Sequence, residues 1–308
     1  MNTHQKIVIP GGAGYLGKAL AAYFADLGFE IIILSRQPKN SSQKNIRFVA
    51  WDGENLGDWQ QEFEGAAAVI NLAGRTVNCR YNETNKKEIY DSRLKSTKVV
   101  GEAITKCSVP PKVWLNASSA TIYRDAEDRP MDEATGEIGI GFSVDVCRQW
   151  EQVFNEAMTP QTRKIALRTS IVFGKGAGGP YEAFRNAVKL GLGGAMGSGT
   201  QFVSWIHLED FCRSLQWLLE HEELTGAFNL ASPNPKKNSD FMRDFRQACG
   251  MPFGLPAMDW MLEIGAFFLQ TETELLLKSR RVVPTRLLDS GFVFKYPNFD
   301  SALSAIAK

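Results

Sequence analysis

The chain has 308 residues, of which 44% are hydrophobic and 22% are charged, and its 35 basic residues nearly balance 34 acidic ones. This composition is typical of a globular protein with a large apolar core, and the net charge of +1 argues against nucleic-acid or membrane-surface partners. Five cysteines without a C-x-x-C spacing predict a reduced, cytoplasmic protein with neither a disulfide framework nor a metal site. Because no apolar run reaches roughly 18 residues and a strand is predicted directly after MNTHQ, we expect no membrane span and no signal peptide.

The first half of the chain alternates apolar strands with helices. Strands are predicted at Ile7–Pro10, Glu30–Leu34, Ile46–Trp51, Ala67–Leu72, Val113–Ser118 and Ile165–Ile171. The helices between them are predicted at Tyr15–Leu27, which Gly28 ends, at 85–107 and at Ser143–Met158. Because apolar strands joined by helices run parallel and are buried on both faces, the pattern predicts an α/β fold with a doubly wound, Rossmann-like sheet.

The second half of the chain is richer in glycine. Glycines crowd residues 174–180 and 191–199, which we expect to form loops. A helix predicted at Leu208–Glu220 and a strand at Ala227–Leu230 are expected to rejoin the sheet.

The C-terminal region is predicted to be mainly helical, with helices at Phe241–Cys249 and Met258–Leu269. Its large apolar residues are expected to form a small core, with a lid or a dimer surface as the alternatives: Trp260, Met261, Phe267 and Phe268. We therefore predict a Rossmann-like domain over residues 1–174, rejoined by 200–231, and a small substrate or lid region over 175–199 and 232–308.

The first predicted strand ends in a glycine turn, GGAGYLG (11–17), that leads into a helix. Gly11 allows a tight turn, Gly14 lets the backbone approach a pyrophosphate, and Gly17 lets the helix lie close to the strand. Free N–H groups and the helix dipole favour an anion there. The turn predicts dinucleotide binding, with a turn that holds no ligand as the alternative, and the expected contacts are Gly11, Gly12, Ala13, Gly14, Tyr15, Leu16 and Gly17.

The end of the second strand indicates which nucleotide is preferred. An NAD site usually has an acidic residue there for the ribose hydroxyls, whereas this chain has Ser35 and Arg36. Since a guanidinium suits a 2′-phosphate, we predict NADP(H) in preference to NAD(H), although an arginine without a ligand is a common alternative. Asp52 and Gly53, after the third strand, are predicted to face the adenine amino group or to form a plain turn.

Together these motifs resemble the extended short-chain dehydrogenase/reductase superfamily of sugar-nucleotide epimerases and dehydratases. The resemblance rests on GGAGYLG, NLAG (71–74), SSATIY (118–123), LRTSIVFG (167–174) and WIHLED (205–210). More closely, the chain resembles the atypical "epimerase family" with a C-terminal domain of unknown function, through NLAGRTVNCRY (71–81), DSR (91–93), VCRQWE (146–151), GGAMGSGTQFVSWIHLED (193–210) and VVPTRLLDSGFVF (282–294). The matched segments add Leu72, Ala73, Gly74 and Arg93 to the expected cofactor contacts.

The resemblance also implies a serine after the fifth strand and a Tyr-x-x-x-Lys pair about twenty-five residues later, in which the tyrosine moves the proton. Ser119 fits the serine, but the helix that should carry the pair offers Ser143 and Cys147, or Phe142 and Val146 in the neighbouring phase. No tyrosine of this chain is followed four residues later by lysine. Because a serine alone is too weak an acid near pH 7, another group must supply the proton, or the protein only binds its cofactor.

Ser119 and Tyr123 are the predicted catalytic residues, and the substrate cleft is predicted to include Arg80, Tyr81, Lys86 and His207, with Asp210 nearby. Each has a structural alternative. Tyr123 is alternatively a packing residue with a hydrogen-bonded hydroxyl, and Arg80 and Lys86 are solvated charges at a helix start. His207 alternatively joins loops through a backbone carbonyl, while the strand-end serines, with Asn71 and Asn116, satisfy backbone groups.

Two functions follow from this pattern. The first is an NADP(H)-dependent oxidoreductase or epimerase-like enzyme that acts on a small polar substrate, with Ser119 polarising the substrate oxygen. The second is a non-catalytic NADP(H)-binding redox sensor or scaffold, which the missing Tyr-x-x-x-Lys pair favours. Either is expected as a monomer or a homodimer.

Overall fold

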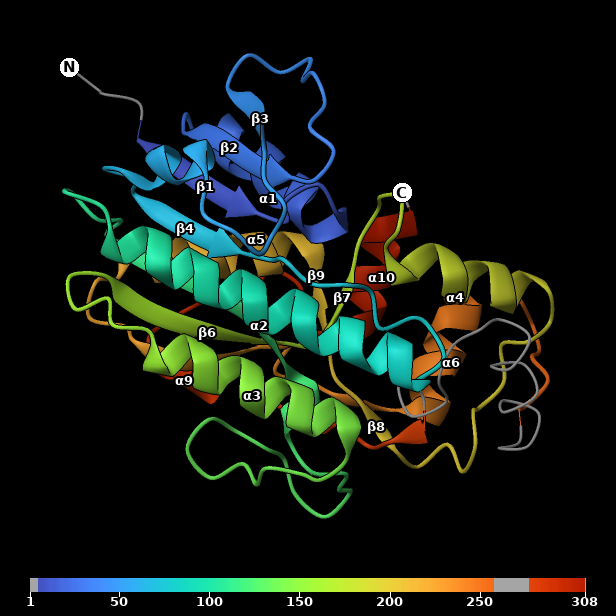
Figure 1. Cartoon of the computed structure of the whole chain (residues 1–308). Helices are drawn as coiled ribbons and strands as arrows, with labels where there is room; N and C mark the ends of the chain where they lie inside the picture. Colours follow the sequence, from blue (N-terminus) through green and yellow to red (C-terminus); the bar gives the residue numbers. More distant parts are fainter. Residues whose placement is uncertain (1–4, 258–276, 308) are drawn as a thin grey trace.

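The computed structural model describes residues 5–257 and 277–307, and its centre is a seven-stranded parallel sheet (Figure 1). The strand order is β10-β6-β5-β4-β1-β2-β3, so the chain starts in the middle of the sheet and builds outward in both directions. The strands are β1 Lys6–Pro10, β2 Glu30–Ser35, β3 Ile46–Ala50, β4 Ala68–Asn71, β5 Val113–Ser119, β6 Arg163–Thr169 and β10 Gly226–Leu230. The predicted doubly wound fold is confirmed, including the return of residues 226–230 to the sheet edge.

Helices cover both faces of this sheet. Successive strand residues point to opposite faces, and since both sets are apolar, each face packs against helices. On one face, Ile7 and Ile9 pack with α1 (Tyr15–Asp26), α5 (Leu208–Glu220) and α9 (Thr285–Asp289). On the other, Val8 packs with α2 (Glu83–Thr105), α3 (Phe142–Glu156) and the 3₁₀ helix η1 (Asp58–Phe63). None of the described helices is both long and apolar enough to cross a membrane.

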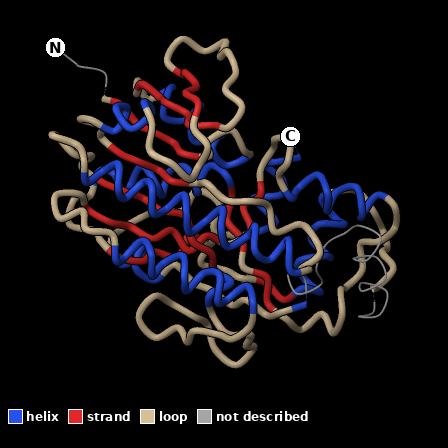
Figure 2. Tube along the Cα trace, in the orientation of Figure 1, coloured by secondary structure: helices blue, strands red, loops and turns tan. Residues whose placement is uncertain are grey.

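A second core lies beside the sheet, among α4 (Pro180–Lys189), α6 (Asn238–Ala248) and α10 (Phe299–Ala307) (Figure 2). Its centre is aromatic, because the rings of Phe241 and Phe299 stack with centroids 4.3 Å apart. Phe173 packs edge-on against Phe299 and at a tilt against Phe241. Two short sheets join this region to the rest, β7 (Ile171–Phe173) with β9 (Trp205–His207), and β8 (Phe202–Val203) with β11 (Lys236–Lys237). The helix predicted at Met258–Leu269, with its four large apolar residues, lies outside the described residues.

The sixth predicted strand, Ile165–Ile171, was wrong at its end, because the chain leaves the sheet at Ser170. The Ser170 N–H and hydroxyl both donate to the Leu230 carbonyl, at 3.0 and 2.8 Å. The next residues form β7, which pairs with β9 in a separate sheet. Helices α4 and α10 are also among the elements that the apolar pattern did not indicate.

Asp210 joins the C-terminal segment to the sheet domain. Its carboxylate is fully buried at the start of α5 and accepts hydrogen bonds from the N–H groups of Lys295 and Tyr296, at 2.8 and 2.7 Å. Arg213, one turn along α5, donates to the same carboxylate at 2.7 Å. A buried charge with this many donors fixes residues 295–296 against α5.

We therefore expect Asp210→Asn to lower the free energy of unfolding by about 3 kcal/mol, since the amide cannot accept all three hydrogen bonds or neutralise Arg213. Urea unfolding followed by circular dichroism measures the change. Asp240→Asn is the matched control, because its ion pair with Arg243 is exposed and should contribute less than about 0.5 kcal/mol. Equal losses in the two variants would contradict this account of Asp210.

Candidate functional site

The glycine turn lies at the carboxyl edge of the sheet, against the ends of the two strands that flank β1. Gly11 has φ +73° and donates its N–H to the Leu34 carbonyl of β2 at 3.0 Å. A Cβ on Gly11 would lie 2.6 Å from Ala73 Cα, just after β4. Only glycine combines this backbone conformation with such a close approach, so the turn and the NLAG segment are held together.

The helix after the turn is packed as its glycines predict. A Cβ on Gly17 would lie 2.4 Å from the backbone of Gly12, so α1 touches the turn directly. Gly14 is the N-cap of α1, has no side-chain capping bond, and would have nothing within 4 Å of an added Cβ. The first N–H groups of the helix therefore receive no side-chain cap, and the space beside Gly14 is open, as at an anion site.

Tyr15 links the turn to the glycine-rich loop after β7. Its ring is so close to Gly176 and Gly179 that an added Cβ would lie within 3.0 and 2.7 Å of it. The hydroxyl is buried without a hydrogen-bond partner among the described residues, and burial raises the pKa of Tyr15 to about 12. The glycines at 174–179 are thus needed to accept this ring, a contact that the sequence pattern did not indicate.

The predicted adenosine-side residues lie on the neighbouring strands. Ser35 is buried at the end of β2, where its hydroxyl and the Gln37 backbone form a local turn at 3.2 Å. Arg36 follows and is exposed, and it makes no ion pair within the described part of the chain. The Asp52 carboxylate accepts the N–H groups of Glu54 and Asn55 at 2.8 Å, as in the plain-turn alternative.

Arg93 extends from α2 beneath the NLAG segment. One guanidinium nitrogen donates to the carbonyls of Arg75 and Ile89, both at 3.1 Å, and the group lies 5.1 Å from the Trp150 ring centre. Gly74 permits this approach, because a Cβ there would lie 3.3 Å from Arg93 Cζ. Burial lowers the pKa of Arg93, and no carboxylate pairs with it among the described residues.

Ser119, at the end of β5, is held by Thr121 of the 3₁₀ turn η2 (Ala120–Ile122). Its Oγ accepts hydrogen bonds from the Thr121 N–H at 3.2 Å and from Thr121 Oγ1 at 2.9 Å. Thr121 Oγ1 lies 3.4 Å from Cys147 Sγ on α3. Because Ser119 Oγ already accepts two hydrogen bonds, its own proton is available for a further acceptor.

Tyr123 lies in a different polar network. Its side chain is fully buried, and its hydroxyl donates to Asn229 Oδ1 and accepts from Arg168, both at 2.9 Å. Arg168 in turn pairs with Glu151, which accepts the Ser118 hydroxyl at 2.6 Å. This geometry supports the packing interpretation of Tyr123, since its hydroxyl is committed to Asn229 and Arg168 and makes no hydrogen bond with Ser119. The network was missed because Arg168 gave no signal within its strand.

The remaining predicted cleft residues have structural partners. Lys86 pairs with Glu83 at 3.2 Å and lies 5.8 Å from the Phe142 ring centre, and Tyr81 packs on the same ring at 4.7 Å. His207 caps α5, where its Nδ1 accepts the Glu209 N–H at 3.1 Å, so it contacts an N–H rather than the carbonyl expected in the alternative. Burial lowers the pKa of His207. Arg80, half-buried, precedes α2 in the same segment.

Asn71 and Asn116 support the backbone as expected. Asn71 donates to Asn116 Oδ1 at 2.7 Å and accepts the Ala73 N–H at 3.1 Å. This pair holds the ends of β4 and β5 together, so Ala73 and Ser119 belong to one edge of the sheet.

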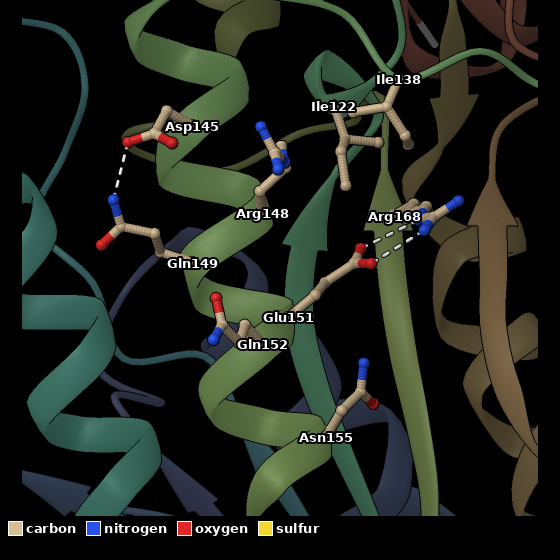
Figure 3. A pocket seen from close by; sticks show the side chains of 9 residues that line it. All are labelled: Ile122, Ile138, Asp145, Arg148, Gln149, Glu151, Gln152, Asn155 and Arg168. Carbon is tan, nitrogen blue, oxygen red and sulfur yellow. Dashed lines mark hydrogen bonds and ion pairs between the residues drawn. The ribbon is translucent and has the colours of Figure 1, made fainter.

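An open cavity of about 380 Å³ lies beside α3, at the flank where Glu151 of the helix faces Arg168 of β6 (Figure 3). Asp145, Arg148 and Gln149 of α3 line it, together with the Glu151–Arg168 ion pair. None of the predicted cofactor contacts lines this cavity, so it is separate from the glycine turn.

Comparison with known families matches nearly the whole chain. Residues 7–231 match the model of the NAD-dependent epimerase/dehydratase family, and residues 259–306 match a domain of unknown function, DUF1731. An epimerase family protein of Mycobacterium bovis is 31% identical over 299 residues, which is 96% of each chain. The epimerase family protein YfhF of Bacillus subtilis is 28% identical over 304 residues, 98% of each chain.

Solved structures give the same result. The crystal structure of human epimerase family protein SDR39U1 (isoform 2) with NADPH has a TM-score of 0.87 and 29% identity, covering 98% of this chain and 99% of that one. A UDP-N-acetylglucosamine 4-epimerase from Bacillus cereus, 20% identical over 98% of this chain and 95% of its own, has a TM-score of 0.75 and shows the shared fold.

Gly14 and Gly17 should respond differently to substitution by alanine. We expect Gly17→Ala to lower the free energy of unfolding by about 3 kcal/mol, because its Cβ would overlap the Gly12 backbone at 2.4 Å. Gly14→Ala should cost no more than about 1 kcal/mol, since it changes only an exposed N-cap. Thermal and urea unfolding measure both, and a stable Gly17→Ala protein would refute the described contact.

Proposed function

Because this chain belongs to the NAD-dependent epimerase/dehydratase family, we propose that it binds NADP(H) at the glycine turn and uses it to transform a small polar substrate at Ser119. The observation that carries the proposal is the turn itself. The start of α1 has no side-chain cap to compete for its N–H groups, and the space beside Gly14 is open. Glycine turns of this kind, at the start of a helix after a parallel strand, bind the pyrophosphate of a dinucleotide.

Selection of the 2′-phosphate is assigned to Arg36. It follows β2, next to the glycine turn, and no carboxylate of the described residues pairs with it. A guanidinium binds phosphate through charge-assisted hydrogen bonds, and an acidic residue that would favour NAD is missing at this position. The human relative whose structure contains NADPH supports this preference, whereas more distant neighbours of the same fold were solved with NAD.

Ser119 is the group proposed to polarise the substrate oxygen. When bound, the nicotinamide supplies or accepts a hydride at a substrate carbon. Ser119 accepts two hydrogen bonds from Thr121, so its own O–H donates to the substrate oxygen and stabilises the negative charge that forms there. The nearby guanidinium of Arg93, which has no carboxylate partner among the described residues, adds positive charge at this edge of the sheet.

The alternative function is a redox sensor or scaffold that binds NADP(H) without chemistry. It is favoured by the burial of Tyr123 and by Ser143 and Cys147, which stand on α3 in place of the Tyr-x-x-x-Lys pair. Calorimetric titration with NADPH and NADP+ separates sensor from scaffold, since a sensor must distinguish the two forms. The enzyme proposal requires in addition that NADPH be consumed with some member of a carbonyl substrate panel.

Arg36→Asp should weaken NADPH binding about 50-fold and NADH binding less than about threefold, because only the 2′-phosphate meets the new carboxylate. Isothermal titration calorimetry measures both dissociation constants. Lys39→Asp changes the net charge equally three residues further along the same exposed segment and should leave the ratio unchanged. Equal losses for NADPH and NADH in Arg36→Asp would remove this assignment.

Ser119→Ala should lower kcat about 100-fold on any carbonyl substrate found in the panel, since one oxyanion donor is lost. The dissociation constant of NADPH should stay within about twofold, because Ser119 is proposed to contact the substrate and not the phosphates. Steady-state NADPH oxidation and calorimetry give the two numbers. An unchanged kcat would exclude Ser119 as the polarising group.

A further inference from the structure

The hydrogen bonds around Ser119 have a defined direction. Thr121 Oγ1 donates its proton to Ser119 Oγ at 2.9 Å, so it has none left for the sulfur atom 3.4 Å away. Cys147 Sγ must therefore be the donor in its contact with Thr121. The Cys147 thiol thus donates to Thr121, and Thr121 donates to Ser119. The Ser119 proton is the one that is not used within this chain of hydrogen bonds.

We propose that Cys147 is the terminal proton donor of the reaction and that it acts on the substrate oxygen through Thr121 and Ser119. The inference rests on the proposed function and deepens it, because it names the acid that replaces the missing tyrosine. It gives a chemical role to the buried Cys147 thiol on α3.

A thiol is the right kind of acid for this position. Serine and threonine hydroxyls can pass a proton on, but they are too weakly acidic to supply one near pH 7. A thiol is a stronger acid, with an ordinary pKa of about 8.5. Burial raises the pKa of Cys147, so the thiol stays protonated, as a phenol would, until the substrate oxygen takes the charge.

The charged groups around the thiol are of both signs. Arg93 from α2 and Arg280 from the C-terminal segment favour the thiolate, and Glu151 on α3 opposes it. The Thr121 hydroxyl also favours the thiolate, because once the thiol proton has left, Thr121 Oγ1 can donate to the sulfur. The Tyr90 hydroxyl, also near Cys147, is committed to Asp145 at 2.5 Å. Two guanidinium groups thus provide the positive charge that lysine provides in the usual pair.

The proton transfer balances without a further reagent. As negative charge forms on the substrate oxygen, that oxygen takes the Ser119 proton, Ser119 Oγ takes the Thr121 proton, and Thr121 Oγ1 takes the Cys147 proton. Two O–H bonds and one S–H bond break, and three O–H bonds form. The net change is one proton moved from the thiol to the product hydroxyl, and water returns a proton to the thiolate after the product leaves.

A thiol titration tests the relay in the whole protein without a substrate. The absorbance difference at 240 nm between the wild type and Cys147→Ser gives the titration midpoint of this thiol. We expect Thr121→Val and Arg93→Met to raise that midpoint by about one pH unit each, since each removes a group that stabilises the thiolate. The midpoint of Cys107, obtained in the same way from Cys107→Ser, should not move in Thr121→Val. An unchanged Cys147 midpoint in Thr121→Val overturns the relay.

Kinetics on a substrate from the panel separate an acid from a packing residue. Cys147→Ala and Cys147→Ser should both lower kcat about 100-fold with an unchanged dissociation constant for NADPH, because a hydroxyl fills the space of the thiol but not its acidity. Rescue of kcat by Cys147→Ser would mean that the residue only packs and would overturn the proposal. Cys107→Ser, at the far end of α2, should have wild-type kcat.

The two proposals fail in different ways. Loss of NADPH binding in the wild type would refute the proposed function while the thiol titration still reports on the relay. If the wild type binds NADPH and turns over a substrate, and Cys147→Ser has the same kcat, the proposed function stands and only the relay is refuted.

Discussion

The backbone contact between Gly12 and Gly17 is the constraint on which the rest of the site depends. Without a Cβ on either residue, α1 begins directly against the turn, and its unpaired N–H groups come out at the carboxyl edge of the sheet. Gly11 sets the same edge against Ala73. Any side chain in these positions would push the helix or β4 away, and the anion site and the Ser119 edge would no longer share one surface.

The C-terminal segment is joined to this framework by side-chain hydrogen bonds of the half-buried Glu133 and of Ser204. Glu133 accepts the N–H groups of Asn229 in β10 and of Arg286 in α9, at 2.8 and 3.3 Å, and burial raises the pKa of Glu133. The Ser204 hydroxyl donates to the Arg280 carbonyl at 2.6 Å, which fixes Arg280 close to α3. The C-terminal segment therefore contributes residues to the surroundings of Cys147, although it follows the sheet domain in sequence.

Local patterns predicted what depends on short segments, namely the glycine turn, the parallel sheet implied by βαβ units and the strand at Ala227–Leu230. They did not predict side-chain direction at the end of β5. Ser118 and Ser119 are neighbours in sequence but have different partners, since Ser118 donates to Glu151 and Ser119 accepts from Thr121. Tyr123 follows the η2 turn and is buried. Its burial depends on the packing of α3 and β6 around it, and a local sequence pattern does not contain that information.

A reaction at a carbonyl needs an acid that is neutral at pH 7 and a cation that stabilises its conjugate base, but it does not need these to be tyrosine and lysine of one helix. Here α3 contributes the sulfur, α2 and the C-terminal segment contribute the guanidinium groups, and η2 supplies the hydroxyl that connects them to the sheet edge. Because the parts come from four segments, a search for the Tyr-x-x-x-Lys spacing cannot find them. In the proposed relay, the same physical requirement is met without the motif.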